Sequence, residues 1–281
     1  MDVFALPTVD ALLRRALDED LGAGDITTRL TVPPERRGHA DIVAKAPAVI
    51  AGLPLVRRIV ALTPAQVAVV EHVADGTRVA PGTALATLAG AAHTLLVIER
   101  LSLNLLQHLS GIATLTAEFV EAVAGTACRI VDTRKTLPGL RVLQKYAVRA
   151  GGGRNHRLRL DDGILIKNNH ITAAGGVGAA VRAARAGAPH GVKVEVECST
   201  HAEVDEALAA GAEIIMLDNM TLEQMRIAVQ RIGGRAIVEA SGGITLANVR
   251  AVAETGVDII SIGALTHSAP AVDIHMRLRL A

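Results

Sequence analysis

Cationic side chains gather in one segment, residues 132–158, which reads DTRKTLPGLRVLQKYAVRAGGGRNHRL. Arg134 and Lys135 follow directly on an apolar β-like run, and parallel α/β folds place their chemistry at the carboxyl ends of strands. His156 and Arg157 follow three consecutive glycines, a stretch that is too flexible for a helix and can bring backbone close to a ligand. An isolated His is more often structural, but beside these cations it helps to predict a site for anionic groups.

Three other cations in this segment, Arg141, Lys145 and Arg149, have a different spacing. They lie four residues apart, so they would share one face of a helix. A solvated helix face is therefore the favoured interpretation for these three side chains.

Lys167 ends a second β-like run, GILI. A Lys in this place can act as a Schiff-base nucleophile, contact a phosphate or carboxylate, or simply be solvated, and its position does not choose among these roles. Glu197 and Asp218 end two further consecutive runs. Such carboxylates can hold ribose hydroxyls or a Mg²⁺ bound to phosphates, because Mg²⁺ usually takes one or two protein oxygens and leaves the rest to substrate. One of the two acids could instead pair with Lys167.

The last two β-like runs end in loops of small residues. These are Ser241, Gly242 and Gly243 in the first loop, and Gly263, Ala264 and Leu265 in the second. Small residues after the final strands of a barrel, followed by a helix N-terminus, form a common cup of backbone amides for phosphate. The two loops together predict a sugar-phosphate site.

A pattern repeated six times would position these residues: an apolar β-branched run, a polar cluster and a helical segment. The runs and clusters span residues 128–135, 163–170, 192–199, 213–219, 236–243 and 258–267. Thr200 with Glu203, and Thr221 with Gln224, form capping boxes that open two of the helices. Alternating buried strands and helices predict a parallel sheet. Six units with their polar residues at strand carboxyl ends favour a TIM-like α/β barrel, with a doubly wound sheet as the alternative.

The N-terminal half has a different rhythm. It predicts a short amphipathic helix over about 8–19, and antiparallel strands over 40–90, where short β-like runs are separated by Pro and Gly. A long helical pattern follows over about 93–122, with Ser110-Gly111 as a candidate break, so we predict a domain boundary near Gly111. The predicted parts are an N-terminal domain over 1–111, a catalytic barrel over 112–270, and a tail over 271–281 that packs back on the N-terminal domain.

Composition excludes several classes of function. The net charge is +1 with both signs interspersed, and the chain has no Trp, one Tyr and two Phe, which leaves nucleic acid neither a basic surface nor stacking platforms. Cys128 and Cys198 lie inside apolar runs without a CxxC pair, as in a reduced protein. The N-terminus does not have the pattern of a signal peptide, and no apolar run is long enough to cross a membrane. We therefore expect a cytoplasmic protein with no nucleic-acid or membrane partner.

Several blocks, in the same order from about residue 10 to the end, resemble the quinolinate phosphoribosyltransferase family. The blocks are ERLSLNLLQHLSGIAT (99–114), DTRKT-PGLR with KYA and GGG-NHR (132–157), LIK-NH (165–170), EVE (195–197), MLDNM (216–220), EASGGIT (239–245) and TGVDIISIGALTHS (255–268). The resemblance implies an N-terminal open α/β sandwich domain and an incomplete TIM-like α/β barrel. It also implies a homodimer whose sites lie between the barrel of one subunit and the N-terminal domain of the other.

The reaction implied by the resemblance joins quinolinate to the phosphoribosyl group of phosphoribosyl pyrophosphate, with Mg²⁺ and loss of CO₂, and gives nicotinate mononucleotide. The implied quinolinate ligands are Arg100, Arg134, His156, Arg157 and Lys167, of which Arg100 would come from the partner subunit. The implied residues for phosphoribosyl pyrophosphate and its Mg²⁺ are Lys135, Glu197 and Asp218, with Thr133 beside them and the loops 241–243 and 263–265 on the 5-phosphate. The expected catalytic residues are Lys135, Lys167, Glu197 and Asp218.

One block departs from the family pattern, because Asn168 stands in Lys167-Asn168-Asn169-His170 where an Asp is expected. The missing carboxylate puts in doubt any pairing of that position with Lys167. Three alternatives stay open: a paralogue of the same fold associated with molybdenum uptake, a Schiff-base aldolase barrel using Lys167 or Lys135, and a phosphate-sensing binding protein. The last would have no reason to gather so many cations opposite the glycine loops.

Overall fold

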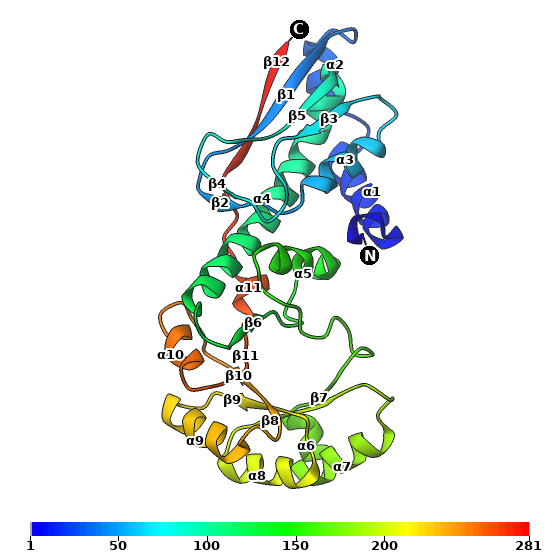
Figure 1. Ribbon diagram of the computed structural model, residues 1–281. Helices are drawn as coiled ribbons and strands as arrows, with labels where there is room; N and C mark the ends of the chain where they lie inside the picture. Colours follow the sequence, from blue (N-terminus) through cyan, green and yellow to red (C-terminus); the bar gives the residue numbers. More distant parts are fainter. Residues whose placement is uncertain (1, 281) are drawn as a thin grey trace. The chain divides into compact units, whose positions relative to one another are not determined.

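The six apolar runs of the C-terminal half form one parallel sheet in the computed structural model, which describes residues 2–280 (Figure 1). The strands are β6 (Arg129–Val131), β7 (Ile164–Ile166), β8 (Val194–Cys198), β9 (Ile214–Asp218), β10 (Ile237–Ser241) and β11 (Ile259–Ser261). They pair in the order β6-β11-β10-β9-β8-β7. The chain thus advances one strand at a time and β11 returns to β6, as in a barrel, whereas a doubly wound sheet reverses its strand order. Within the described residues β6 and β7 do not pair, so the predicted incomplete TIM-like barrel is confirmed.

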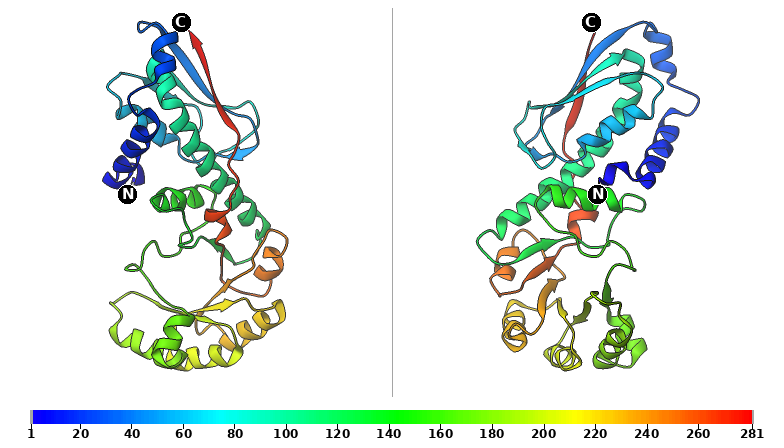
Figure 2. Two further views of the ribbon diagram at one scale, coloured as in Figure 1. Left: turned by 180° about the vertical axis from the view of Figure 1, so that it is seen from behind. Right: turned by 45° about the vertical axis from the view of Figure 1, so that its right-hand side comes forward.

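Helices cover the outside of these strands. They are α6 (Asn168–Ala174), α7 (Val177–Gly187), α8 (His201–Ala210), α9 (Leu222–Ile232), α10 (Val249–Ala253) and α11 (Ala264–His267). Figures 1 and 2 show α7, α8 and α9 side by side along the outer face of the strands. The two predicted capping boxes are confirmed, since Thr200 and Thr221 each accept the N–H of the residue three positions later at 3.2 Å.

The period of two along each strand decides which side chains face the interior of the barrel. On β8, Glu195 and Glu197 share one face, and on β10, Glu239 and Ser241 do the same. β9 and β10 pair in parallel with Ser241 opposite Asp218. Polar side chains therefore converge at the carboxyl ends, with further acids one layer below them.

The N-terminal half contains a four-stranded antiparallel sheet in the order β12-β1-β5-β3. Its strands are β1 (Arg37–Ala44), β3 (Ala68–Glu71), β5 (Ala84–Ala91) and β12 (Ile274–Leu280), while β2 (Ala48–Val49) and β4 (Arg78–Val79) form a separate antiparallel pair. The helices around it are η1 (Val3–Ala5), α1 (Pro7–Leu21), α2 (Ile26–Thr31), α3 (Leu53–Ala61) and α4 (Ala92–Ala122). The predicted first helix and antiparallel strands are thus present, and β12 adds the C-terminal segment to the edge of this sheet beside β1.

The sequence did not predict α3. Its first backbone N–H groups, those of Gly52 and Leu53, donate to the two carboxylate oxygens of Asp75 at 2.7 and 3.1 Å. This cap lies more than twenty residues away in the chain, so no local capping pattern marks the start of the helix. The carboxylate of Asp75 also accepts a hydrogen bond from the Tyr146 hydroxyl at 2.7 Å.

Chain contacts divide the molecule into two units that do not follow one cut in the sequence. The first contains the chain up to Ala117, Leu137–Gly152 and the chain from Ser268 onward; the second contains Glu118–Thr136 and Gly153–His267. The helix α5 (Arg141–Ala150) therefore belongs to the first unit. The candidate break at Ser110-Gly111 is not present, because α4 continues through it, and the domain limits near Gly111 stay a prediction.

The solvated face expected on α5 is wrong for one of its three cations. Lys145 is buried, with 2% of its surface exposed. Arg149 is exposed as expected, and its guanidinium carbon lies 5.9 Å from the centre of the Tyr146 ring. Helical spacing finds residues that share a face, but only packing decides whether that face meets solvent.

Gly111 allows α4 to pack closely against the segment that leads to β12. A Cβ atom added at Gly111 would lie 2.0 Å from the carbonyl oxygen of Pro270. We expect Gly111→Ala to lower the free energy of unfolding by about 1–3 kcal/mol or more, because relieving the clash requires a shift of backbone in α4 or in the segment around Pro270. Urea unfolding measures this change. Gly187→Ala is the control, since its Cβ would meet nothing within 4 Å, and equal stability of both variants would contradict the prediction.

Candidate active site

A cavity of about 590 Å³ opens at the carboxyl ends of the barrel strands. Eleven of the sequence-predicted site residues line it: Thr133, Arg134, Lys135, His156, Arg157, Lys167, Glu197, Asp218, Ser241, Gly242 and Gly243. Leu165, Met216, Asn219, Glu239 and Ser261 complete the lining. The barrel thus brings together residues that are spread over more than a hundred positions of the chain.

The backbone of Lys135 is held from two sides. Its N–H donates to the Thr133 hydroxyl at 3.0 Å, and its carbonyl accepts a hydrogen bond from the Thr266 hydroxyl at 2.8 Å. Thr266 lies on α11, directly after the last strand of the barrel. The start of the cationic segment is therefore fixed to the loop in which the sequence predicts a phosphate cup.

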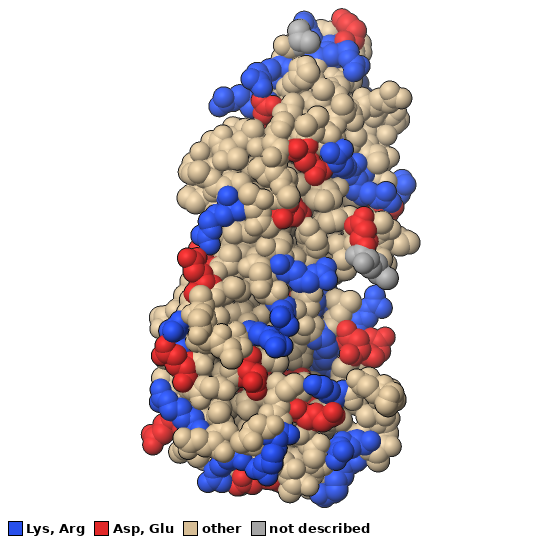
Figure 3. All heavy atoms as spheres, viewed as in Figure 1, with Lys and Arg blue, Asp and Glu red and all other residues tan. Residues whose placement is uncertain are grey.

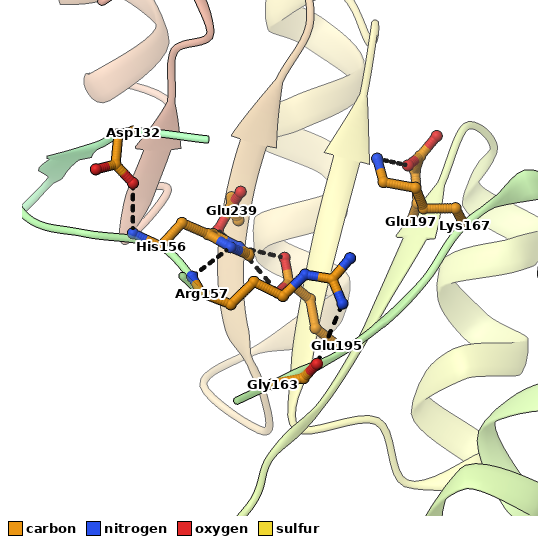
Figure 4. Close-up of polar contacts among 8 residues, drawn as sticks. All are labelled: Asp132, His156, Arg157, Gly163, Lys167, Glu195, Glu197 and Glu239. Atoms are coloured by element: carbon orange, nitrogen blue, oxygen red, sulfur yellow. Dashed lines mark hydrogen bonds and ion pairs between the residues drawn. The ribbon is translucent and has the colours of Figure 1, made fainter. Parts of the chain in front are cut away.

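The loop that carries His156 and Arg157 is fixed to the end of β6 by Asp132. The fully buried Asp132 accepts the backbone N–H of His156 at 2.9 Å and the side-chain amide of Asn155 at 2.6 Å. Arg157 in turn donates to the carbonyl oxygen of Gly163 at 3.1 Å. Figure 4 shows the contacts of Asp132 with His156 and of Arg157 with Gly163, which hold both site residues over the interior of the barrel.

Arg134 and Arg157 both line the cavity and are close enough for their charges to interact. Burial lowers the pKa of the Arg157 guanidinium, and the positive charge of Arg134 lowers it further. The buried Nε of Arg134 has no hydrogen-bond partner among residues 2–280. Two neighbouring guanidiniums of this kind favour an anionic ligand, since carboxylate and phosphate oxygens match their donors in charge and geometry.

Lys167 pairs with an acid, one of the alternatives that the sequence left open. Its Nζ lies 3.2 Å from Oε2 of Glu197, while the side-chain amide of Asn168 donates to Oε1 of the same carboxylate at 3.1 Å. The departure from the family pattern therefore has a structural consequence. Asn168 has no carboxylate with which to pair with Lys167, and its amide instead helps to hold Glu197 in place.

Asp218 is held in a similar way by the next residue. The side-chain amide of Asn219 donates to Asp218 Oδ2 at 2.9 Å, and the backbone of Asn219 is left-handed with φ 55°. A Cβ at Gly242 would lie 2.2 Å from Asn219 Oδ1. The glycine of the first small-residue loop is thus required by the side chain that orients Asp218.

Three polar residues that the sequence did not single out lie below these groups: Glu195, Glu239 and Ser261. All three are buried, and ligand-type atoms of His156, Glu195 and Glu239 lie within 4.8 Å of one another. A signal for the acids was present, because each Glu interrupts an apolar strand two residues before a predicted site residue, which places both on the same face. Figure 4 shows His156 beside Glu195 and Glu239, with the Lys167–Glu197 pair apart from them.

Four predicted site residues are not part of the cavity lining. Arg100 is exposed on α4 in the first unit, and its role stays a prediction. Gly263 lies next to Lys135, whose Cδ would be 2.9 Å from an added Cβ, and Ala264 begins α11. The side chain of Leu265 is fully buried, so this residue can offer a ligand only its backbone.

On the face that Figure 3 shows, Lys and Arg side chains are interspersed with Asp and Glu. This face therefore has no large patch of positive charge that would attract anions. Anions must therefore be held by local groups such as those of the cavity. No helix in the described part of the chain is long and apolar enough to cross a membrane.

Comparison with known families agrees with this fold. Residues 25–110 match the N-terminal domain and residues 112–277 the C-terminal domain of "Quinolinate phosphoribosyl transferase". The chain therefore belongs to the quinolinate phosphoribosyl transferase family. Its cavity, which contains two neighbouring guanidiniums and several acids, lies at the carboxyl ends of the α/β barrel strands.

Individual relatives are similar over nearly the whole chain. The "Nicotinate-nucleotide pyrophosphorylase [carboxylating]" of Mycobacterium leprae is 48% identical over 272 residues, which cover 95% of each chain. The "Probable nicotinate-nucleotide pyrophosphorylase [carboxylating]" of Synechocystis sp. is 46% identical, covering 96% of this chain and 92% of the relative. The crystal structure of NadC from Streptococcus pyogenes has a TM-score of 0.93 at 42% identity and covers 97% of both chains.

The contacts of Asp132 predict that it positions His156. We expect Asp132→Ala to lower the free energy of unfolding by about 1–3 kcal/mol, because it leaves buried donors without an acceptor. We also expect weaker binding of anions in the cavity, measured by calorimetry on the folded variant. Asp161→Ala, an exposed residue of the same loop, is the control and should change neither quantity; an Asp132 variant that behaves like it would show that the loop does not depend on this anchor.

Proposed function

We propose that this cavity transfers the phosphoribosyl group of phosphoribosyl pyrophosphate to quinolinate, with loss of CO₂, to give nicotinate mononucleotide. The activity of the chain is that of a carboxylating nicotinate-nucleotide pyrophosphorylase in NAD biosynthesis. The observation that supports this cavity as the place of reaction is the pairing of Arg134 with Arg157, where a buried guanidinium nitrogen has no partner in the described chain. Quinolinate, a dicarboxylate, would supply the acceptors.

In this proposal the two quinolinate carboxylates are bound by Arg134, His156, Arg157 and Lys167. Lys167 would exchange its contact with Glu197 for one with the substrate, or share its donors between the two. Asn168 would keep Glu197 in place during that exchange, because its hydrogen bond to the other carboxylate oxygen does not involve Lys167.

Phosphoribosyl pyrophosphate would lie along the opposite side of the cavity. Lys135 would contact its phosphates, and the backbone of the loops after β10 and β11 would hold the 5-phosphate. Glu197 and Asp218 fit a Mg²⁺ bound to the substrate, because they offer hard oxygen ligands from neighbouring strands, each oriented by an adjacent amide. Mg²⁺, when bound there, would offset the charge of the pyrophosphate.

The chain's own groups contribute positioning and charge. Displacement of pyrophosphate from C1 of the ribose develops positive character on the sugar, and the ring nitrogen of quinolinate must be held about 3–3.5 Å from C1. The fixed loop of His156 and Arg157 would orient the ring through its carboxylates. After transfer the ring nitrogen is positively charged beside a carboxylate, which makes the loss of CO₂ electronically favourable.

The Schiff-base alternative is not favoured by the contacts of Lys167. Its Nζ is engaged in an ion pair with Glu197 at 3.2 Å, whereas a Schiff-base nucleophile must be free to attack a carbonyl carbon. The relatives with nearly full coverage carry the pyrophosphorylase name, so the molybdenum-associated alternative is not retained either.

The assembly is also a proposal. A homodimer in which Arg100 of one subunit reaches the cavity of the other would complete the set of quinolinate ligands. Its exposure on α4 fits such a role, and the isologous symmetry of a dimer would create two equal sites.

The reaction is tested by incubating the protein with phosphoribosyl pyrophosphate, Mg²⁺ and either quinolinate or nicotinate. We expect quinolinate to give nicotinate mononucleotide and CO₂ in equal amounts, measured by chromatography and ¹⁴CO₂ release. Nicotinate should be used at least about tenfold less efficiently, because cations placed for its missing carboxylate stay unpaired at about 1–3 kcal/mol each. Comparable turnover of nicotinate would contradict the proposed set of carboxylate ligands.

Mixing two inactive variants tests the shared site. Arg100→Ala and Lys167→Ala should each be nearly inactive as homodimers. A heterodimer of the two would contain one site with both defects and one with neither, so its activity should return to about half of the wild-type value. Because Arg100 is exposed on a helix, Arg100→Ala should change the free energy of unfolding by no more than about 0.5 kcal/mol. Thermal unfolding of the variant checks that it folds normally.

Native mass spectrometry would establish that heterodimers form in the mixture. If they form and the activity stays at the level of the parent variants, Arg100 acts within its own subunit or not at all, and the shared-site model is wrong. Arg14→Ala, an exposed Arg of α1, serves as the matched control, since it should retain activity alone.

A further inference from the structure

Glu239 forms part of the floor of the cavity. It is 1% exposed and lines the cavity from β10. Within residues 2–280 its Oε1 has no hydrogen-bond partner, and its Oε2 lies 3.6 Å from Nε2 of His156. A carboxyl group this deeply buried requires either a close cation or a proton.

His156 is the nearest group that can carry a positive charge, and it serves two acids. Its Nδ1 accepts the backbone N–H of Arg157 at 2.9 Å. Its Nε2 lies 3.1 Å from Oε2 of Glu195 and 3.6 Å from Oε2 of Glu239. Glu195 is therefore the nearer carboxylate, and a single imidazole balances at most one of the two acids.

One N–H group cannot balance two buried carboxylates, so Glu239 keeps a proton of its own. Its burial raises its pKa to about 7, and the charge of Glu195 contributes to the rise. His156, the Ser261 hydroxyl on β11 and the more distant Lys167 act in the opposite direction without cancelling it. At neutral pH a large share of the protein thus holds a carboxylic acid, rather than a carboxylate, in the floor.

We propose that Glu239 is the acid that protonates C2 of the pyridinium ring after CO₂ has left. This step rests on the proposed reaction. The bond from C2 to its carboxylate breaks and leaves its electron pair on C2, next to the positive ring nitrogen, while CO₂ departs. The O–H bond of Glu239 then breaks, its proton forms the new C2–H bond, and the carboxylate takes a proton from water before the next turnover.

The other polar residues near the floor are poor proton donors. The guanidiniums of Arg134 and Arg157 do not give up protons in proteins, and Nε2 of His156 is already engaged by Glu195 at 3.1 Å. Lys167 is half exposed and paired with Glu197. His156 and Arg157 line the same cavity as Glu239, and Nε2 of His156 lies 3.6 Å from Oε2 of Glu239. If these two residues hold the carboxylates, as in the proposed function, the carbon that loses CO₂ would lie over the floor that contains Glu239.

Hydrogen exchange at C2 of nicotinate mononucleotide tests this assignment, because the same group that adds the proton must also remove it in reverse. The wild-type protein is incubated with nicotinate mononucleotide in D₂O, and loss of the C2 proton signal is followed by NMR against a sample without protein. We expect the wild type to accelerate exchange and Glu239→Gln to reduce it at least about a hundredfold, the size of effect expected for a positioned general acid.

Glu239→Gln keeps the size and neutrality of the protonated acid, so quinolinate should bind with an affinity within about threefold of the wild type. Exchange by this variant at the wild-type rate, or no acceleration by the wild type, overturns the proposal. Glu239→Ala provides a second readout that does not depend on Gln packing correctly: added formate should restore exchange to this variant and leave the wild type unchanged. No effect of formate also counts against the proposal.

Failure of the proposed function would give a different result. If the wild type released no pyrophosphate from phosphoribosyl pyrophosphate with quinolinate, the function itself would be wrong. If it releases pyrophosphate and CO₂ while Glu239→Gln exchanges C2 normally, only the role of Glu239 is wrong. The proposal is supported if Glu239→Gln still releases pyrophosphate but forms nicotinate mononucleotide slowly.

Discussion

Two guanidiniums, those of Arg134 and Arg157, lie so near each other that the charge of one lowers the pKa of the other, and much of the site follows from keeping them there. Like charges in a partly buried place repel strongly, so the chain must hold them by other contacts. The carbonyl of Gly163 holds Arg157, and Asp132 holds the loop that carries it. The result is a region of concentrated positive charge that is held in place by the chain's own contacts, which favours anionic ligands.

Negative charge in the same cavity is controlled in two different ways. At the mouth, Glu197 and Asp218 are oriented by neighbouring amides, and Lys167 balances Glu197. In the floor, Glu195 lies closest to His156, and Glu239, whose pKa is raised by burial and by the charge of Glu195, retains a proton. An acid that stays ionised suits ribose and metal, whereas an acid that stays protonated can donate a hydrogen bond or a proton. The depth within the barrel separates these two behaviours.

The barrel geometry explains why both layers exist. Side chains two residues apart on one strand face the same interior, so on two strands a polar residue at the carboxyl end has an acid one layer below it. Glu195 lies below Glu197 on β8, and Glu239 lies below Ser241 on β10. The parallel pairing of β9 and β10 then places Asp218 opposite Ser241. The mouth and the floor are therefore consequences of one periodicity.

The sequence alone determined the βα repeat, the capping boxes at Thr200 and Thr221, and the polar clusters at the strand ends, because these depend on short-range patterns in the chain. It could not predict α3, whose cap Asp75 is distant in sequence, or the burial of Lys145, which depends on packing. The same limit applies to the floor of the site. That His156 lies near both Glu195 and Glu239, and that burial raises the pKa of Glu239, was decided only by the tertiary structure, since protonation depends on burial and on neighbours from separate segments of the chain.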